Sequence, residues 1–374
     1  GRHISLLNGR AYKQEELLDE GKYKVLRVGN FNTNSKWYYS NLELEENKYV
    51  NKGDLLYLWA TNFGPEIWTE EKAIYHYHIW KLEFDRTEIN QDYLNIWLES
   101  DKNKIQQNTN GSTMVHITKT MMEERRVSLP NFDEQSAIGS LFRNLDNLLA
   151  SYKDNLANYQ SLKETMLSKM FPKAGQTVPE IRLDGFEGEW KKVKLKDVTE
   201  SIEYGLNASA KEFDGENKYI RITDIDDVSR KFKEDSLTSP DINVSECDNY
   251  LLCEKDILFA RTGASVGKTY LYDMKDGKVY FAGFLIRARI KEKFDSKFIF
   301  QNTLTNRFTQ YVKVTSQRSG QPGVNGKEYG EYELYLPKYE EQQAIGAYFS
   351  NLDNLINSYQ EKISQLETLK KKLL

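Results

Sequence analysis

Cysteine and histidine are scarce in this sequence, and their scarcity limits the metal and redox chemistry that the chain could carry. The 374 residues include 2 Cys and 4 His. Two cysteines, Cys247 and Cys253, are too few for a disulfide framework or a zinc site. The histidines do not combine with acids or cysteines in a ligand pattern, and His76 and His78 alternate in the strand-like run YHYHIW. We therefore expect neither a metal site nor a cofactor.

Long hydrophobic runs are absent as well. No apolar stretch approaches the roughly 20 residues of a membrane-spanning helix. The first residues, GRHISLLNGRAY, lack the sustained apolar region of a signal peptide. With 39% hydrophobic and 29% charged residues, the composition is that of a globular protein, and 374 residues suffice for two domains. We expect a cytoplasmic protein without membrane association.

Positive charge is not in surplus. The chain has 52 Lys and Arg against 56 Asp and Glu, a formal net charge of −4. A protein that binds nucleic acid mainly by covering phosphates would ordinarily be basic. Any binding of nucleic acid must therefore rest on local groups of polar and basic residues.

What the sequence does contain is one long repeat. Residues 129–167 align with residues 336–374 without a gap, and 18 of the 39 positions are identical. A proline is the second residue of each copy (Pro130 and Pro337), and acidic residues follow it, as suits a helix N-terminus. The repeat therefore predicts two related helices, one in the middle of the chain and one at its end.

Apolar residues in both copies recur at alternating steps of three and four, the spacing of a helical seam. A helix over all 39 positions would be about 58 Å long at 1.5 Å per residue. A seam of this length needs a partner, and each helix is the obvious candidate for the other. Two unrelated core helices are the alternative, but burial alone would not require the shared polar positions Asn144, Asp146 and Asn147. The expected seam residues are Ile138, Leu141, Leu145, Leu148 and Tyr152 in the first helix and Ile345, Tyr348, Leu352, Leu355 and Tyr359 in the second.

The regions between the helices have a β-strand pattern. Short aromatic and branched runs such as DLLYLW and DILFAR alternate with Gly, Asn and Asp. Weak echoes relate the two regions, because KVLRVGNF resembles KYIRITDI. The fold class we predict is α+β, with two mostly β domains joined by two long antiparallel coiled-coil helices and a pseudo-twofold internal repeat. The predicted boundaries are 1–130 and 185–336 for the domains, 131–171 and 337–374 for the helices, and 172–184 for a linker.

At this point the sequence resembles the specificity subunit of type I restriction–modification systems. The resemblance covers nearly the whole chain and rests on LPNFDEQSAIG and LPKYEEQQAIG at the helix starts, LKETMLSKMFP at 162–172, VPEIRLDGFEGEWKKVKLKDV at 178–198 and DILFARTGASVGKTYL at 256–271. It implies that each β domain reads one half of a bipartite site in double-stranded DNA. It also implies that the helices set the spacing and dock two methyltransferase subunits, with restriction subunits joining through the complex.

One departure concerns the start of the chain. The segment 178–198 leads into the second domain, whereas nothing equivalent precedes the first domain, which starts near the counterpart of Gly205 if Gly9 is that counterpart. We therefore expect the N-terminal lead-in segment of the first domain to be missing. Either the start is truncated or the first domain borrows its lead-in strand.

The strongest catalytic motif is a false match. The run TGASVGKT at 262–269 is close to a phosphate-binding loop, but Thr262 replaces the first required glycine and strand-like YLYD follows Lys268. A tight turn between two strands, served by Gly263 and Gly267, is the simpler interpretation. We find no methyltransferase motif, and no acids grouped with a lysine at the spacing of a nuclease. The chain is expected to be a non-catalytic subunit.

Polar, glycine-bearing loops are where base-reading residues are expected, because Arg, Lys, Asn and Gln distinguish base edges. A plain solvated loop is the alternative for any single residue. A protein-binding scaffold and an unrecognised enzyme remain open as alternative functions. The DNA-binding candidates in the first domain are Arg10, Lys13, Asn30, Asn32, Asn34, Lys36, Asn62, Gln107, Asn108, Asn110, Ser112 and Thr113. In the second domain they are Lys211, Arg261, Thr262, Lys268, Gln317, Arg318, Gln321, Asn325 and Lys327.

Overall fold

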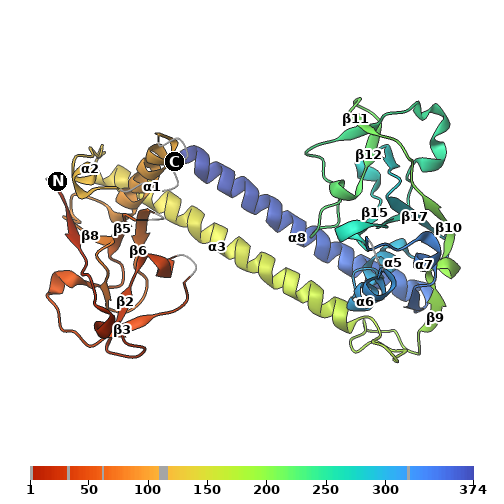
Figure 1. Ribbon diagram of the computed structural model, residues 1–374, viewed down its shortest axis with the longest axis horizontal. Coiled ribbons are helices and arrows are strands. Elements are labelled where there is room, and N and C mark those ends of the chain that lie inside the picture. Colours follow the sequence, from red (N-terminus) through yellow and green to blue (C-terminus); the bar gives the residue numbers. More distant parts are fainter. Residues whose placement is uncertain (1–2, 32–33, 61–62, 109–116, 318–320) are drawn as a thin grey trace. The chain divides into compact units, whose positions relative to one another are not determined.

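The computed structural model divides into two compact units. Unit 1 comprises Gly1–Ser151 and Ile363–Leu374, and unit 2 comprises Tyr152–Lys362. Two long helices, α3 (Phe132–Lys169) and α8 (Tyr339–Leu373), each contribute residues to both units (Figure 1). The structure describes residues 3–31, 34–60, 63–108, 117–317 and 321–374.

The described part of unit 1 contains two four-stranded sheets (Figure 1). Its elements besides the long helices are β1 (Ile4–Asn8), β2 (Tyr23–Leu26), β3 (Tyr38–Ser40), β4 (Tyr49–Val50), β5 (Leu55–Leu58), β6 (Gly64–Ile67), β7 (Ala73–Tyr75), β8 (Ile79–Phe84), α1 (Gln91–Asn108) and α2 (Lys119–Glu123). One sheet has the order β1-β8-β5-β6, and the other has the order β3-β2-β7-β4 with β2 parallel to β7. Helix α1 packs Leu94, Leu98 and Ile105 onto the first sheet, since these residues share one helical face.

Unit 2 is built in the same way. Its elements besides the long helices are β9 (Lys191–Lys194), α4 (Leu195–Val198), β10 (Thr199–Tyr204), β11 (Ala210–Glu212), β12 (Lys218–Ile220), β13 (Thr238–Pro240), β14 (Asp256–Ala260), β15 (Thr269–Leu271), β16 (Val279–Phe281), β17 (Leu285–Ile290), α5 (Ser296–Asn302), α6 (Asn306–Thr315), α7 (Gly326–Gly330) and β18 (Glu333–Leu336). Its main sheet has the order β10-β17-β14-β15, and β12 pairs with β16 in parallel. These strands match β1-β8-β5-β6 and the pair β2 and β7 of unit 1.

Main-chain hydrogen bonds fix the correspondence between the two units. The Gly9 amide donates to the Ile79 carbonyl at 3.3 Å, and the Gly205 amide donates to the Leu285 carbonyl at 3.1 Å. Arg10 then forms a parallel β-bridge with His76, just after β7, and Leu206 forms one with Ala282, just after β16. Gly9 is therefore the counterpart of Gly205, and the internal repeat extends through both β domains.

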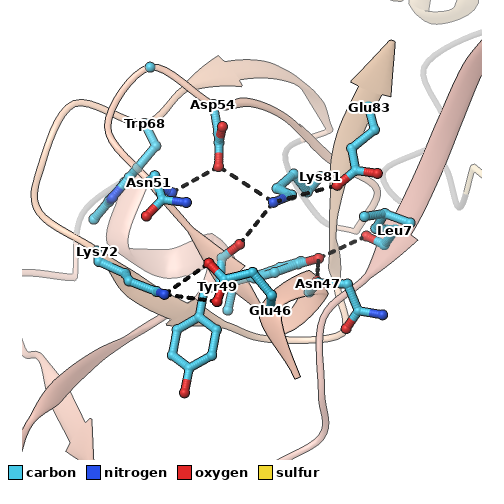
Figure 2. A network of polar contacts seen from close by, with 12 residues as sticks. Leu7, Glu46, Asn47, Tyr49, Asn51, Asp54, Trp68, Lys72, Lys81 and Glu83 are labelled. Carbon is cyan, nitrogen blue, oxygen red and sulfur yellow. Dashed lines mark hydrogen bonds and ion pairs between the residues drawn. The ribbon is translucent and has the colours of Figure 1, made fainter. Parts of the chain in front are cut away.

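The equivalent strands β8 and β17 each contain one buried cationic side chain, Lys81 in unit 1 and Arg287 in unit 2. In unit 1 the Lys81 ammonium, 8% exposed, donates to the Tyr49 carbonyl at 3.2 Å and lies 3.7 Å from Asp54 and 3.8 Å from Glu83 (Figure 2). This arrangement joins the two sheets of unit 1, because Lys81 belongs to β8 and Tyr49 to β4. A buried charge is tolerated only when it is paired and hydrogen-bonded, as it is here.

In unit 2 the corresponding cation is Arg287. It is 3% exposed, donates to the Leu251 carbonyl at 3.2 Å and pairs with Glu203. Asp256, which is fully buried, lies 4.0 Å from Arg287 and accepts two hydrogen bonds from Arg289 at 2.8 and 2.9 Å. This bidentate pair raises the pKa of Arg289. We assign these cations to the stability of the sheets, since each is paired with carboxylates of its own unit.

The segment between α3 and β9 belongs to unit 2 and packs against its core. The Ile181 amide donates to the Lys169 carbonyl at 2.9 Å, and Trp190 is 2% exposed beside Phe298. Strand β9 then pairs antiparallel with β18. In the described part of unit 1, residues 126–129, which align with β18 in the repeat, form no strand and have no such partner.

The helices pair antiparallel, as predicted. Within unit 2 the Tyr159 and Tyr359 rings stack at 5.5 Å, and Lys163 bonds Asp353 at 2.5 Å, so that rising numbers on α3 meet falling numbers on α8. Within unit 1, Lys370 of α8 pairs with Asp146 of α3. The predicted α+β fold, with two sheet-rich domains and two long helices, is confirmed.

The buried face of each helix differs from the expected seam. Leu145, Ile345 and Leu352 are buried, but Leu141 is 55% exposed and Leu148 is 40% exposed. Leu355 is 36% exposed, while Ile138, Tyr348, Tyr152 and Tyr359 are half-buried. The first turns of each helix must face the β domain from which the helix emerges, so neighbouring positions such as Phe142 and Phe349 are buried instead.

Candidate nucleic-acid interface

The repeated Glu-Gln-x-Ala-Ile-Gly motif fastens each long helix to its own β domain. In unit 1, Gln135 is 2% exposed, and its Oε1 accepts from the Asn90 amide at 2.9 Å. Its Nε2 donates to the carbonyls of Pro130 at 2.9 Å and Glu88 at 3.2 Å. All three partners belong to the chain just before α1 or α3. The amide of Gln135 therefore fixes the start of α3 against the start of α1.

The second copy makes the same attachment in unit 2. Gln342 is 2% exposed; its Oε1 accepts from the Asp295 amide at 3.2 Å, and its Nε2 donates to the Pro337 carbonyl at 3.0 Å. Gly346 faces the same α5 N-terminus, where a Cβ would lie 2.5 Å from the Asp295 carboxylate. Gly139 is its counterpart, with a Cβ placed 2.8 Å from that of Asp92. We call these two attachments the helix anchors.

A second element holds α8 in unit 2. Glu341 is 1% exposed, and its carboxylate receives two hydrogen bonds of 2.7 Å from the guanidinium of Arg182. This bidentate contact raises the pKa of Arg182. The segment that the sequence placed in a linker therefore contributes to the anchor of α8.

Two loops of unit 2 that are distant in sequence form one surface. The Gly263 amide donates to the Pro322 carbonyl at 3.0 Å, and the Val324 amide donates to the Arg261 carbonyl at 2.9 Å. The Arg261 guanidinium lies 5.1 Å from the centre of the Tyr204 ring, a cation–π distance. This surface brings together the predicted residues Arg261, Thr262 and Gln321, and Gln317 and Lys327 are exposed near its edges.

The motif that resembles a phosphate-binding loop is part of this surface and connects two strands. Strand β14 pairs antiparallel with β15, and no helix follows Lys268. Gly263 and Gly267 have φ angles of 74° and 84°, values that L side chains rarely adopt. The expected connection between two strands therefore forms, but as a longer loop over residues 261–268 that contains a 3-10 helix (Gly263–Ser265) rather than as a tight turn.

Some candidates in unit 2 have their polar groups engaged within the fold. Lys268 is 8% exposed; its ammonium donates to the Ile225 carbonyl at 3.1 Å and lies 2.5 Å from Asp227. Asn325 caps α7 by accepting from the Glu328 amide at 2.9 Å. Lys211 is exposed on β11, which Figure 1 places apart from α7 within unit 2.

In unit 1 two predicted asparagines shape their own loop. Asn30 Oδ1 accepts from the Arg27 amide at 3.0 Å, and its Nδ2 donates to the Lys36 carbonyl at 3.1 Å. Asn34 Oδ1 accepts from the Lys36 amide at 3.0 Å. Lys36 itself is exposed, with its ammonium 5.0 Å from the centre of the Tyr38 ring. The two asparagine side chains are therefore engaged by nearby main chain, whereas the Lys36 side chain is exposed.

The remaining candidates of unit 1 are spread over other elements. Arg10 bonds Glu16 at 2.7 Å, which lowers the pKa of that carboxyl, and Lys13 is exposed beside it. Gln107 is exposed in the last turn of α1, and Asn108 is its last residue. Six candidates lie outside the described residues: Asn32, Asn62, Asn110, Ser112, Thr113 and Arg318.

Exposed aromatic residues near these loops were not among the predicted site residues. Tyr204 is 46% exposed, Phe284 is 62% exposed and Tyr77 is 40% exposed. The sequence signal that could have found them is their position at strand ends beside the glycine-bearing loops. From sequence alone these aromatic residues cannot be told from the buried aromatic residues of the neighbouring strands, so they are easily interpreted as core residues.

Comparison with known proteins decides the family. Residues 3–158 and 187–368 match the family described as the type I restriction modification DNA specificity domain. The chain belongs to this family. The two matched ranges each contain one β domain and most of one long helix, so this specificity-domain family accounts for both halves of the repeat.

Named relatives agree with this membership. The chain is 25% identical over 337 residues to the type I restriction enzyme MjaVIII specificity subunit of Methanocaldococcus jannaschii, covering 87% of this chain and 78% of the relative. It is 21% identical over 394 residues to the EcoBI specificity subunit of Escherichia coli, covering 97% and 81%. The fold matches the crystal structure of the S subunit from M. genitalium with a TM-score of 0.65 at 15% identity, covering 100% and 92%.

The described residues contain neither a candidate membrane span nor a candidate metal site. None of the helices there combines the length and the apolar character needed to cross a membrane. No group of three or more His, Cys, Asp or Glu side chains in that part of the chain is placed to hold a metal ion.

Proposed function

We propose that this specificity subunit reads a bipartite site in double-stranded DNA, with unit 1 and unit 2 each reading one half. The observation that carries the proposal is the duplication itself. The same sheet order, the same buried cation and the same helix anchor occur once in each unit. A protein with two equivalent readers suits a target with two parts on one duplex.

The partners we propose are two methyltransferase subunits docked along α3 and α8, with restriction subunits joining through the complex. One solved structure, which concerns complex assembly and conformational transition of the type I restriction–modification system, matches the fold with a TM-score of 0.52 at 14% identity and covers 100% of this chain and 96% of its own. Leu141 and Leu148 are exposed on α3 and Leu355 on α8, so apolar surface is free for such contacts. The acidic net charge fits a division of labour in which the methyltransferases supply many phosphate contacts.

The chain itself supplies specificity and carries no catalytic step in this proposal. It needs no cofactor, and its place of action is the cytoplasm, where its DNA target lies. A non-DNA scaffold would have the same helices but would not discriminate between duplexes. An enzyme would methylate or cleave DNA by itself.

The test is binding by the reconstituted complex of this chain with its methyltransferase. Methylome sequencing of cells that carry the system first identifies the marked site. We expect the complex to bind a duplex with that site at least 100-fold more tightly than a scrambled duplex of equal length at physiological salt. Equal affinity for both duplexes would support the scaffold, and modification of DNA by the purified chain alone would support the enzyme.

A further inference from the structure

The same turn carries an exposed aromatic side chain in each unit. The turn between β16 and β17 presents Phe284, and the turn between β7 and β8 presents Tyr77. Phe284 is 62% exposed and Tyr77 is 40% exposed. A ring left exposed contributes little burial energy to folding. The two rings lie one position apart in equivalent turns, since the main-chain bonds align Phe284 with His78 and Tyr77 with Gly283. We call residues 282–284 and 76–78 the aromatic turns.

Main-chain hydrogen bonds fix the aromatic turn of unit 2 to the loop surface described above. The Phe284 carbonyl accepts from the Arg261 amide at 3.1 Å, and the Gly283 amide donates to the Leu206 carbonyl at 2.8 Å. The position of Phe284 is thus set by the residue whose guanidinium lies over Tyr204. Its ring packs on no other aromatic ring among the described residues.

The aromatic turn of unit 1 is held by the corresponding bonds. The His78 carbonyl accepts from the Trp59 amide at 3.2 Å, and the Tyr77 amide donates to the Arg10 carbonyl at 3.1 Å. The Tyr77 ring lies 4.0 Å from the His78 ring and 6.1 Å from the Trp59 ring. Burial, helped by His78 and Arg27, lowers the pKa of the neighbouring His76 to about 4. The aromatic group around Tyr77 therefore adds no charge from His76 at neutral pH.

Apolar contact beside a cation is a feature of DNA-reading surfaces. Aromatic rings contact the thymine methyl group in the major groove or press against a base step in the minor groove. In unit 2 the Arg261 amide bonds the Phe284 carbonyl. In unit 1 the Arg10 carbonyl accepts from the Tyr77 amide, while the Arg10 guanidinium pairs with Glu16. The main-chain bonds fix the backbone of each turn, so binding need order only the side chain.

We propose that Phe284 and Tyr77 are specificity-determining residues, each making an apolar contact with a base of the half-site that its own unit reads. The inference rests on the proposed function and adds a type of base contact to the polar candidates. The two turns share their main-chain bonds but differ in sequence and in the position that carries the ring, as suits units that each read their own half-site.

The experiment compares Phe284→Ala and Tyr77→Ala with Met274→Ala in the reconstituted complex with methyltransferase. Met274 is a suitable control because it is 69% exposed, in the same unit as Phe284, and lies in a short 3-10 helix (Met274–Asp276) outside the loop surface. We expect Phe284→Ala to weaken binding to the cognate duplex about 10-fold or more, the loss of one good base contact. Methylation-site sequencing should show relaxed sequence choice in the unit 2 half-site only, and Tyr77→Ala should do the same for unit 1.

The outcomes separate this inference from the proposed function. If the wild-type complex does not distinguish cognate from scrambled DNA, the proposed function fails and the inference fails with it. If the wild type discriminates and both aromatic variants bind and mark the wild-type site like Met274→Ala, the inference is overturned and the function stands. A variant that loses methyltransferase binding but reads an unchanged site would assign the ring to a protein contact and would also overturn it. Thermal unfolding checks that each variant is folded. Phe284→Ala should match the wild type, whereas Tyr77→Ala should lose some stability because its ring contacts His78 and Trp59.

Discussion

Arg261 and Gln321 lie where two loops of unit 2 meet, and the main-chain bonds between the loops hold both residues in a defined place. The guanidinium of Arg261 is further ordered by the Tyr204 ring. Gln321 is exposed, and its Nε2 lies beside Gly263. A preordered polar side chain on an exposed surface suits bidentate recognition of a base edge, because little conformational freedom is lost on binding.

Replacing Gln321 tests this role. We expect Gln321→Ala to cost about 1 to 3 kcal/mol of discrimination at one position of the unit 2 half-site. Methylation-site sequencing should show that position relaxed and the unit 1 half-site unchanged. The matched control is Gln176→Ala, an exposed glutamine elsewhere in the same unit. A methylated motif that is the same in both variants and in the wild type would remove Gln321 from the DNA face.

Asn325 was predicted to contact DNA, but its side chain caps α7. We expect Asn325→Ala to lower the free energy of unfolding by about 1 kcal/mol, as loss of a helix N-cap does. Asn325→Asp keeps the acceptor and should retain most of the stability. Chemical denaturation of the two variants measures the difference. Equal stability of Asn325→Ala and the wild type would mean that the cap contributes nothing and that the amide is available for another use.

The candidate site is only partly predictable from sequence at this scale, and the reason is physical. Asparagine amides in loops hydrogen-bond the nearby main chain as readily as they bind bases, so Asn30, Asn34 and Asn325 match both patterns. Lys268 is charged and follows a glycine, yet its ammonium donates to the Ile225 carbonyl and pairs with Asp227. Which of the two uses applies depends on partners that are distant in sequence.

At the scale of elements, the helix anchors explain the part of the repeat that apolar periodicity does not require. Gln135 and Gln342 are buried and each bonds the main chain at the start of another helix, while Gly139 and Gly346 allow the close approach. A long helix fixed in this way cannot swivel against its own β domain. The direction of each helix is therefore tied to the surface that we assign to DNA.

Gln342→Leu tests the anchor of α8. The change leaves the Asp295 amide and the Pro337 carbonyl without their partner, and each unsatisfied buried group costs about 1 to 3 kcal/mol. We expect a clear loss of stability in chemical denaturation and, in the complex, methylation at sites with more than one spacer length. The neighbouring Gln343→Leu is the control, because Gln343 is exposed. Equal stability of the two variants would contradict the anchor.

Periodicity predicts the helices and their antiparallel pairing but not the buried face throughout. Leu141 and Phe142 are adjacent apolar residues, as are Leu148 and Leu149, and the sequence spacing accommodates either set. The structure buries Phe142 and Leu149 and leaves Leu141 and Leu148 exposed. The strand pattern similarly predicts two β domains, whereas the sheet order depends on pairings between distant strands.

At the scale of the whole molecule, the duplicated architecture matches a target with two parts. Each unit presents its own loop surface, and each is fastened to one of two helices of similar length, 38 residues in α3 and 35 in α8. We propose that the helix pair determines which spacing between half-sites the protein accepts. A duplex adds a rotation as well as a distance with every base pair, so a rigid pair would select both together.

The most direct test of this account is to lengthen both helices by one heptad at matched positions, near Asn155 in α3 and Lys362 in α8. The insertion keeps the spacing of the seam and adds about 10 Å to each helix. This equals about three base pairs, or roughly 100° of duplex rotation. Because the anchors fix each helix against its β domain, sequencing of methylated sites should then show loss of methylation, since one unit no longer faces its groove. Unchanged half-sites with a longer spacer would contradict the rigid anchors. Full methylation at the original spacing would contradict the claim that the helices set the distance.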